Sequence, residues 1–212
     1  MPYQPIENYG LIGDMHTVAL VGINGSIDWM CVPNFDSPSV FARILDDDKG
    51  GHFTIHPIDS DTTCKQFYWP ETNVLVTRFL SHDGAAELTD FMPVAGNATG
   101  APRFRRVVRR VTAQRGNVAL RMECKPAFDY ARVAHETEFV DGGAIFHTNA
   151  LALGLTTGVA LDAWEGGVAS TFTLKEGESE SFVLRELADH RVCDSCPSES
   201  ETEALFRDTV AY

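Results

Sequence analysis

The chain has 212 residues, of which 44% are hydrophobic, and its 30 acidic and 17 basic residues give a formal net charge of −13. This apolar content excludes an intrinsically disordered chain, and the acidic balance argues against nucleic acid or an anionic membrane surface as the partner. A neutral sugar is indifferent to net charge, so carbohydrate stays open as a ligand class.

The sequence predicts a cytoplasmic protein. Its longest uncharged apolar stretch, residues 149–161, falls short of the ~20 residues that a membrane span requires. The N-terminus has neither the basic nor the apolar region of a signal peptide. The five cysteines are scattered and odd in number, which fits reduced thiols better than a disulfide framework.

Alternation of apolar and polar residues with a period of two dominates the chain and predicts strands. Asn24-Gly25 separates the first two and is typical of a hairpin with a type I′ turn, in which both central residues have positive φ. Many short strands with turn signals between them, and no βαβ alternation, favour a β-sandwich or a barrel. The predicted strands cover residues 18–21, 27–32, 52–56, 72–80, 104–111, 118–124, 144–147, 151–155, 168–174 and 181–185.

A short helix is predicted near residues 38–45. Ser37 is a suitable N-cap, and Pro38 suits the first helical position. Val40, Phe41, Ile44 and Leu45 would then form one apolar stripe over two turns.

A second helix is predicted at the C-terminus, where Ser198 with Glu201, and Ser200 with Glu203, both match the capping box. The apolar side of this helix should include Leu205, Thr209 and Tyr212, with Phe206 and Val210 beside it. No stop signal follows, which favours a chain cut within a helix. The alternative is a terminal helix docked on the β-domain.

No metal site and no cofactor are predicted. Cys193-Asp194-Ser195-Cys196 is a lone CxxC without a second pair or a βαβ context, so a linker with two free thiols is favoured over a zinc or redox site. The segment from Asp46 begins like a calcium loop, but Gly50 and Pro57 stand where ligands would be needed. A solvated acidic turn is the better interpretation, and the seven histidines are spread along the chain.

Two sets of residues remain as candidates for chemistry with sugars. Glycoside hydrolysis needs two carboxyl groups in opposed protonation states, whereas aromatic faces stack on sugar rings but more often belong to a core. The carboxylates flanked by apolar residues are Asp14, Asp28, Asp36, Asp90 and Asp129, and the aromatic residues of the loop-like segments are Trp29, Phe35, Trp69, Phe128 and Tyr130. Each carboxylate is also explained as a turn or cap residue.

Six segments between residues 6 and 130 carry a family resemblance. They are Ile6–Asp14 (IENYGLIGD), Gly25–Trp29 (GSIDW), Phe35–Phe41 (FDSPSVF), Tyr68–Leu75 (YWPETNVL), Leu88–Pro93 (LTDFMP) and Pro126–Tyr130 (PAFDY). Each one alone is weak evidence, but together they are specific. The chain resembles the N-terminal region of bacterial glycoside hydrolase family 15 proteins, the glucoamylase-like and trehalase-like enzymes.

The resemblance implies an all-β domain, a large antiparallel β-sandwich of the supersandwich type over residues 1–190. Residues 191–212 would form a linker and the start of a helix that leads to an (α/α)₆ barrel. The two catalytic glutamates of the family's inverting mechanism lie in that barrel, so no residue here is assigned a catalytic role.

The predicted function is therefore that of a non-catalytic accessory domain, which packs against the catalytic barrel of an enzyme that acts on α-glucosides. We expect the missing barrel to leave an exposed apolar patch. The residues expected nearest to the barrel or its substrate are Asp28, Trp29, Phe35, Asp36 and Ser37. The alternatives are a stand-alone carbohydrate-binding module and an oligomerisation module that forms a homo-oligomer.

Overall fold

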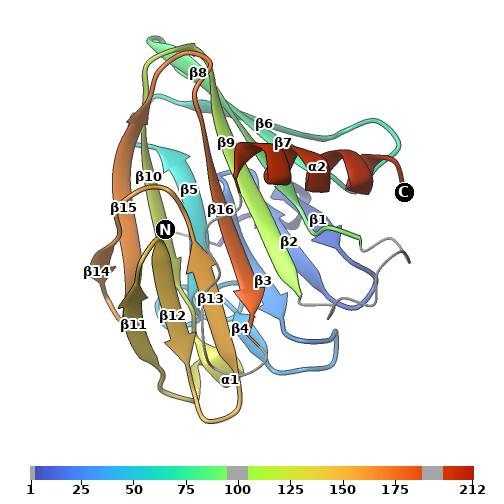
Figure 1. Cartoon of the computed structure of the whole chain (residues 1–212), viewed down its shortest axis with the longest axis vertical. Coiled ribbons are helices and arrows are strands. Elements are labelled where there is room, and N and C mark those ends of the chain that lie inside the picture. The colour runs from blue at the N-terminus through green and yellow to red at the C-terminus, as the bar shows by residue number, and fades with distance from the viewer. Residues whose placement is uncertain (1–2, 95–104, 188–197) are drawn as a thin grey trace.

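A computed structural model describes residues 3–94, 105–187 and 198–212. Two eight-stranded sheets face each other in a sandwich (Figure 1). Every strand pairing in these ranges is antiparallel. The sandwich prediction is thus confirmed, and the barrel alternative is excluded.

Sheet A has the order β1-β2-β3-β5-β10-β15-β14, with β4 paired to β3, and sheet B has the order β11-β12-β13-β16-β9-β8-β7-β6. The strands of sheet A are β1 (Tyr9–Gly13), β2 (Val18–Gly22), β3 (Ser26–Cys31), β4 (Ser39–Phe41), β5 (His52–Pro57), β10 (Val118–Lys125), β14 (Asp162–Trp164) and β15 (Gly167–Leu174). Those of sheet B are β6 (Thr63–Tyr68), β7 (Leu75–Leu80), β8 (Gly84–Phe91), β9 (Arg106–Gly116), β11 (Glu136–Val140), β12 (Gly143–His147), β13 (Ala152–Thr156) and β16 (Ser179–Glu186).

The helix predicted near residues 38–45 is wrong. Residues 39–41 form β4, which pairs with β3, and a turn follows it. Val40 and Phe41 are both buried, whereas Leu45 is largely exposed. An apolar stripe on a helix would bury all of these side chains, so pairing with β3 satisfies the backbone and the apolar residues better than a helix does.

The predicted hairpin at Asn24-Gly25 is confirmed, but its turn type is not. The loop between β2 and β3 has three residues, and Gly25 alone among them has positive φ, at 79°. Its N–H donates to the carbonyl of Gly22 at 2.9 Å. A Cβ at Gly25 would lie 2.3 Å from the carbonyl oxygen of Ile55, so the loop requires glycine on two grounds.

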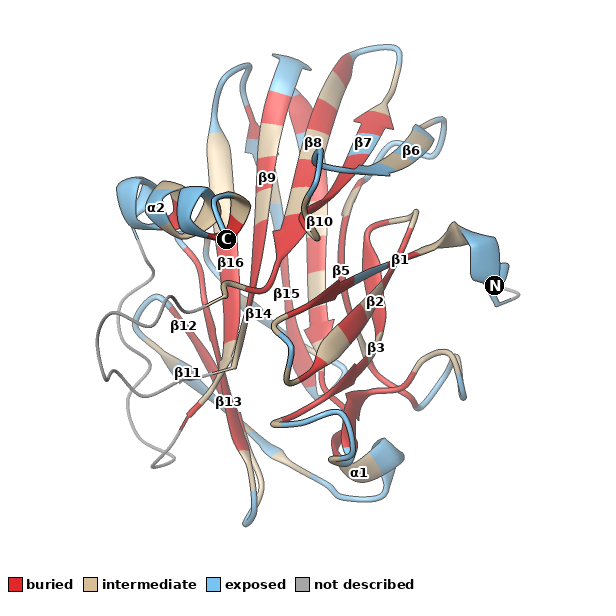
Figure 2. Ribbon diagram, turned by 90° about the vertical axis from the view of Figure 1, so that its right-hand side faces the viewer, coloured by how far each residue is buried: buried red, intermediate tan, exposed pale blue. Residues whose placement is uncertain are grey.

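The C-terminal helix, α2 (Glu199–Val210), begins with the predicted capping box at Ser198 and Glu201. Leu205, Phe206 and Val210 pack on a small apolar cluster of sheet B formed by Val74, Phe91, Val108 and Val183. Tyr212, which was expected on the same side, is exposed instead. Figure 2 shows α2 on the outside of sheet B and the N-terminal segment on the opposite side of the sandwich. The helix is therefore docked on the β-domain.

Among the described residues, the core between the sheets contains one charged pair. Arg109 of β9 is fully buried, and its Nε and Nη2 donate to the two carboxylate oxygens of Asp90 at 2.8 and 3.2 Å. The same guanidinium donates across the sandwich to the carbonyls of Gly25 in the β2–β3 loop and Phe53 in sheet A. It also lies 4.7 Å from the ring centre of Phe53. Arg109 thus joins the two sheets at the centre of the apolar core.

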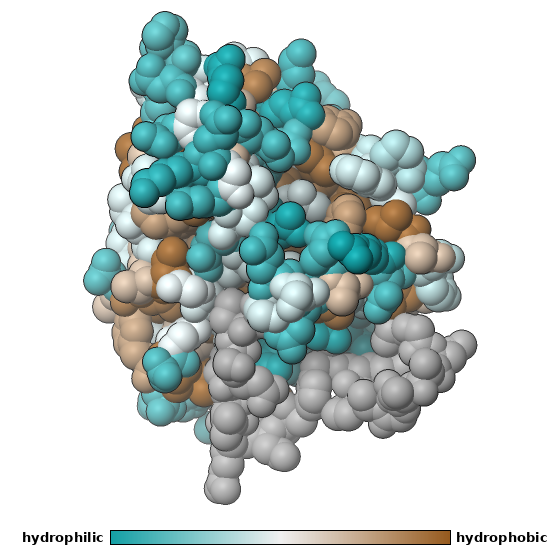
Figure 3. Space-filling view, turned by 45° about the horizontal axis from the view of Figure 1, so that its top comes forward, coloured by the Kyte–Doolittle hydropathy of each residue, from teal (hydrophilic) through white to brown (hydrophobic). Residues whose placement is uncertain are grey.

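The outside of the molecule fits the acidic composition. The face shown in Figure 3 is mostly hydrophilic, with apolar areas between the hydrophilic side chains. Within the described ranges, no helix is long and apolar enough to cross a membrane.

Candidate functional site

Asp28 lies at a β-bulge that turns it away from the core. Leu20 pairs with Trp29 and Val21 pairs with Ile27, so Asp28 is the extra residue of β3. Ile27 and Met30 on either side both belong to the core. The bulge therefore directs Asp28 and Trp29 to the outer face of sheet A.

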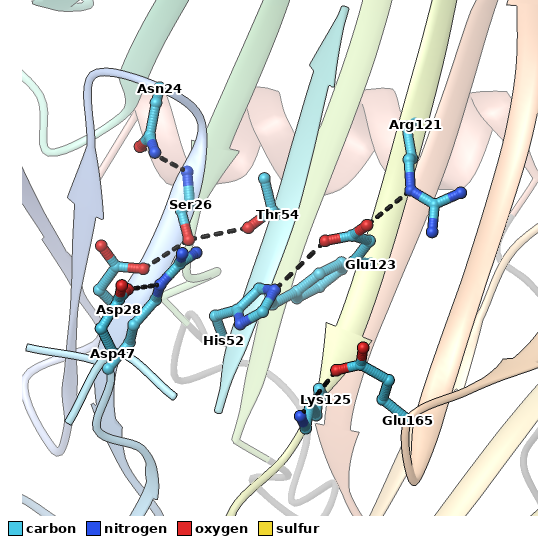
Figure 4. Close-up of polar contacts among 12 residues, drawn as sticks. Asn24, Ser26, Asp28, Asp47, His52, Thr54, Arg121, Glu123, Lys125 and Glu165 are labelled. Atoms are coloured by element: carbon cyan, nitrogen blue, oxygen red, sulfur yellow. Dashed lines mark hydrogen bonds and ion pairs between the residues drawn. The ribbon is translucent and has the colours of Figure 1, made fainter. Parts of the chain in front are cut away.

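A hydrogen-bonded network holds the Asp28 carboxylate, which is only 4% exposed (Figure 4). The hydroxyl of Tyr9 donates to its Oδ2 at 2.7 Å, and the hydroxyl of Ser26 donates to its Oδ1 at 2.5 Å. Thr54 of β5 donates in turn to Ser26 Oγ at 2.8 Å. Burial and the neighbouring Asp28 raise the pKa of Tyr9, so this phenol stays protonated as a donor. Asp28 thus ties β1, β3 and β5 together.

A second polar chain runs beside the first on the outer face of sheet A (Figure 4). His52 Nε2 lies 3.4 Å from Glu123 Oε2, and Arg121 Nε donates to Glu123 Oε1 at 2.5 Å. These two partners, His52 first, hold the pKa of Glu123 at about 2. The carboxylate is therefore ionised throughout the neutral range. The guanidinium carbon of Arg121 lies over the ring of Trp164 in β14, 5.7 Å from the ring centre.

A cavity of about 350 Å³ lies above these two networks. The Arg43 guanidinium binds Asp47 at 2.8 Å on one wall and lowers the pKa of that carboxyl. Glycosidic bond cleavage requires one carboxyl that is still protonated near neutral pH. Asp47 and Glu123 are instead held in the ionised form, so they can accept hydrogen bonds but cannot serve as the acid. The cavity is lined by Tyr3, Tyr9, Asp28, Arg43, Asp47, Thr54, His56 and Glu123, among others.

The other three predicted site residues lie on the β3–β4 loop, separate from the Asp28 network. Phe35 is 55% exposed, Asp36 is exposed, and Ser37 is half-buried. Ser37 Oγ accepts from the N–H of Asn34, and its own N–H donates to the Asn34 carbonyl, both at 3.1 Å. This closed turn presents Phe35 and Asp36 to solvent in one fixed conformation.

The β3–β4 loop is fixed to the β1–β2 turn. The N–H of Phe35 donates to the carbonyl of His16 at 2.9 Å. Arg105 Nε donates to the carbonyl of Pro33 at 3.0 Å and lies 3.9 Å from Asp14 Oδ2. Asp14 also accepts from two N–H groups of the β1–β2 turn, each at 2.9 Å. Arg105 therefore holds both loops in a common position.

Trp29 meets Tyr130 of α1 (Phe128–Ala131), at a centroid distance of 6.1 Å. Asp129, Tyr130 and Ala131 all have positive φ, between 51° and 62°. Three successive non-glycine residues in this region represent stored backbone strain. The guanidinium of Arg132 binds Asp129 Oδ1 at 2.7 Å and stabilises the turn. The predicted aromatic residues therefore do not form one platform, because Trp69 packs on α2 and Phe128 is buried.

Comparison with known proteins identifies the family of this domain. Residues 2–205 match the family described as "Trehalase-like, N-terminal". The chain belongs to the trehalase-like N-terminal family. It is 41% identical over 195 residues to the trehalase of Thermoplasma acidophilum, which covers 91% of this chain and 33% of that protein. It is 33% identical over 206 residues to the trehalase of Mycobacterium tuberculosis, which covers 86% of this chain and 30% of that protein.

The resemblance found in the sequence is thus confirmed at the level of this trehalase-like N-terminal family. The chain is also 39% identical over 157 residues to the trehalase of Thermoplasma volcanium, which covers 73% of this chain and 25% of that protein. It thus spans about a third or less of the length of each of these three relatives. The region is accordingly an N-terminal part of longer enzymes in those relatives.

Sequence reasoning missed several residues that organise this trehalase-like N-terminal domain. The sequence marks Tyr9 only as part of a family segment, although a tyrosine ahead of an alternating strand is a suitable partner for a buried carboxylate. Thr54 gives no signal, because the register of β3 against β5 brings it to Ser26. Met15 gives none either, since its positive φ, 69°, is a property of the folded turn.

The predicted acidic turn lies within the described residues, whereas the CxxC motif does not. The residues from Asp46 form a turn in which Asp46 Oδ1 accepts from the N–H groups of Asp48 and Lys49, as expected for a solvated acidic turn. No group of three metal-ligating side chains comes together in the described ranges. Cys31, Cys64 and Cys124 are free thiols, and the Cys193–Cys196 motif lies outside the described residues.

Proposed function

We propose that this chain is the non-catalytic N-terminal accessory domain of a trehalase-type glycoside hydrolase and that it packs against a C-terminal catalytic domain. One observation carries the proposal. The family match is to an N-terminal region, and the related trehalases are three to five times longer than their matched segment. Residues 191–212 would then form the linker, with α2 as its helical part.

The electrostatics of the cavity support a role other than catalysis. Inverting hydrolysis needs one protonated and one ionised carboxyl on opposite sides of a cleft. Asp47 and Glu123 both have lowered pKa values because guanidinium and imidazole groups bind them. The carboxylate of Asp28 accepts hydrogen bonds at both oxygens from within the domain. These groups stabilise the outer face of sheet A.

The β3–β4 loop is the part proposed to approach the catalytic domain. Its turn is closed by Asn34 and Ser37, and it carries an exposed aromatic ring and a carboxylate at Phe35 and Asp36. A side chain held on a fixed turn loses little entropy when a partner covers it. Asp28 and Trp29 would support this loop from the adjoining strand.

The test uses a fusion in which this chain replaces the matching N-terminal third of the Thermoplasma acidophilum trehalase. We expect the chain alone to release no glucose from trehalose and the fusion to release it. An inactive fusion beside an active parent enzyme would contradict the proposal, as would turnover by the chain alone.

Two further measurements refine this result. Titration of the chain with trehalose by calorimetry should give no binding, whereas millimolar or tighter binding would favour the carbohydrate-binding alternative. In the fusion, Asp36→Ala should change kcat or KM. If both constants stay the same, the β3–β4 loop does not approach the substrate.

A further inference from the structure

A groove of about 540 Å³ lies where the end of α2 meets the edges of both sheets. Its lining includes Met15 from the β1–β2 turn, Tyr68, Trp69 and Glu71 from the β6–β7 connection, and Thr209 and Tyr212 from the end of α2. We call this set the α2 groove. It lies outside the polar cavity of sheet A, and the two do not share a lining residue.

The α2 groove exposes large apolar side chains. Met15 is 63% exposed, Trp69 is 44% exposed, and Tyr212 is 74% exposed. One edge of Trp69 packs on Phe206 at a centroid distance of 5.6 Å, which fixes the indole while part of it remains in water. Exposed apolar side chains grouped around one that is held in place are typical of a contact surface.

The backbone of the groove is strained at two of these residues. Met15 has a φ of 69° and Glu71 has a φ of 60°. Neither residue favours the left-handed region, where glycine and asparagine are preferred. The backbone is thus strained at both sides of the groove, and the strained turn at Met15 holds that side chain in solvent.

The edge of β1 beside the groove is closed to strand addition. Tyr68 Oη accepts from the N–H of Leu11 at 2.8 Å and donates to the carbonyl of Leu11 at 3.0 Å. These bonds occupy the exposed edge of β1 beside the groove, so a partner strand cannot pair there. At this edge a partner must therefore bind through side chains.

We propose that the α2 groove is the docking surface for the folded C-terminal domain of the longer trehalase-like protein. This inference rests on the proposed function and adds to it the face that makes the contact. The helix α2 ends in the groove, so in a longer chain the residues after it start from this surface. The β1–β2 turn that carries Met15 is also joined to the β3–β4 loop, because the Phe35 N–H donates to the carbonyl of His16.

Hydroxyl-radical footprinting of the isolated chain and of the trehalase fusion tests the inference directly. Met15, Trp69 and Tyr212 should react readily in the isolated chain. In the fusion, Met15 should lose its reactivity down to the level of Met92, which is buried in the core of this domain. Phe139, exposed on β11, serves as the control and should react equally in both.

The outcomes separate the two proposals. An active fusion in which Met15 and Trp69 stay reactive would overturn the docking assignment and leave the accessory function standing. Protection of the sheet A cavity instead, read at Tyr3, would do the same. An inactive fusion counts against the accessory function itself.

A pair of variants provides a second test in the fusion. Met15→Lys should shorten the half-life of trehalase activity at elevated temperature, by about tenfold if one buried methionine side chain is lost from the contact. Phe139→Lys should leave that half-life unchanged. Equal half-lives for the two variants would overturn the docking assignment.

Discussion

The Asp90–Arg109 pair and the α2 groove both depart from the usual distribution of polar and apolar side chains, but in opposite directions. The pair places two charges in the core, and the groove places apolar rings in water. The domain offsets the first departure with hydrogen bonds, because Arg109 finds acceptors in both sheets. Nothing within the described residues compensates the second. A compensated departure supports the fold, whereas an uncompensated one indicates a function.

The largest expected effect concerns the buried pair. Arg109→Leu leaves the Asp90 carboxylate in the core without a counter-charge and should destabilise the isolated chain by about 3–5 kcal/mol. The double variant Arg109→Leu/Asp90→Leu removes both charges and should recover most of that loss. Urea unfolding measures both. A double variant that stays as unstable as the single one would show that loss of the cross-sheet bonds, rather than the uncompensated charge, dominates.

The next prediction separates two aspartates of the same sequence region. Asp28→Ala leaves the hydroxyls of Tyr9 and Ser26 without their acceptor in a buried place, so unfolding should require about 1–3 kcal/mol less. Asp36→Ala is the matched control. Its side chain is exposed, so the isolated chain should change by less than about 0.5 kcal/mol. Similar losses for both would refute the division of the predicted site into a structural half and a surface half.

A third prediction uses the titration of Glu123. Its pKa is lowered to about 2 in the folded chain, so the stability that it contributes is complete above about pH 4.5. This contribution is lost as the pH falls toward 2, and amounts to about 1–2 kcal/mol after allowance for partial solvent exposure. Chemical unfolding at pH 7 and pH 3 should show that the free energy of unfolding changes less with pH in Glu123→Gln than in the unchanged chain. An unchanged dependence would mean that other carboxyls account for the acid sensitivity.

The sequence predicted the sandwich because most strands alternate clearly, as Val118–Lys125 does. It missed β8, where small residues precede Leu88 and the inward position after Leu88 holds Asp90, a charge that no alternation rule places in a core. It placed a helix near residue 38, since Ser37-Pro38 imitates a cap that the loop uses for a turn. The sequence also could not predict that the candidate site divides into a network around Asp28 and a separate β3–β4 loop. It depends on a bulge that turns Asp28 outward and on a register that brings Thr54 to Ser26.

The smallest expected effect gives the sharpest test of whether the α2 groove, unlike the Asp90–Arg109 pair, serves a contact. Met15→Asn places a residue that tolerates positive φ in a strained turn, so the isolated chain should gain about 0.5–1 kcal/mol. In the trehalase fusion the same change removes an apolar contact, and the gain should vanish or turn into a loss. The control is Glu165→Asn, because Glu165 also has positive φ but lies at the β14–β15 turn, beside Gly166 and far along the chain from the groove.

That control should stabilise the isolated chain and the fusion equally, since its ion pair with Lys125 is exposed and contributes little. Thermal unfolding of the four proteins, each beside its parent, decides the matter. A gain for Met15→Asn in both contexts would mean that the strain at Met15 serves no contact. A gain confined to the isolated chain would show that the domain gives up stability at this turn in order to present a side chain to its partner.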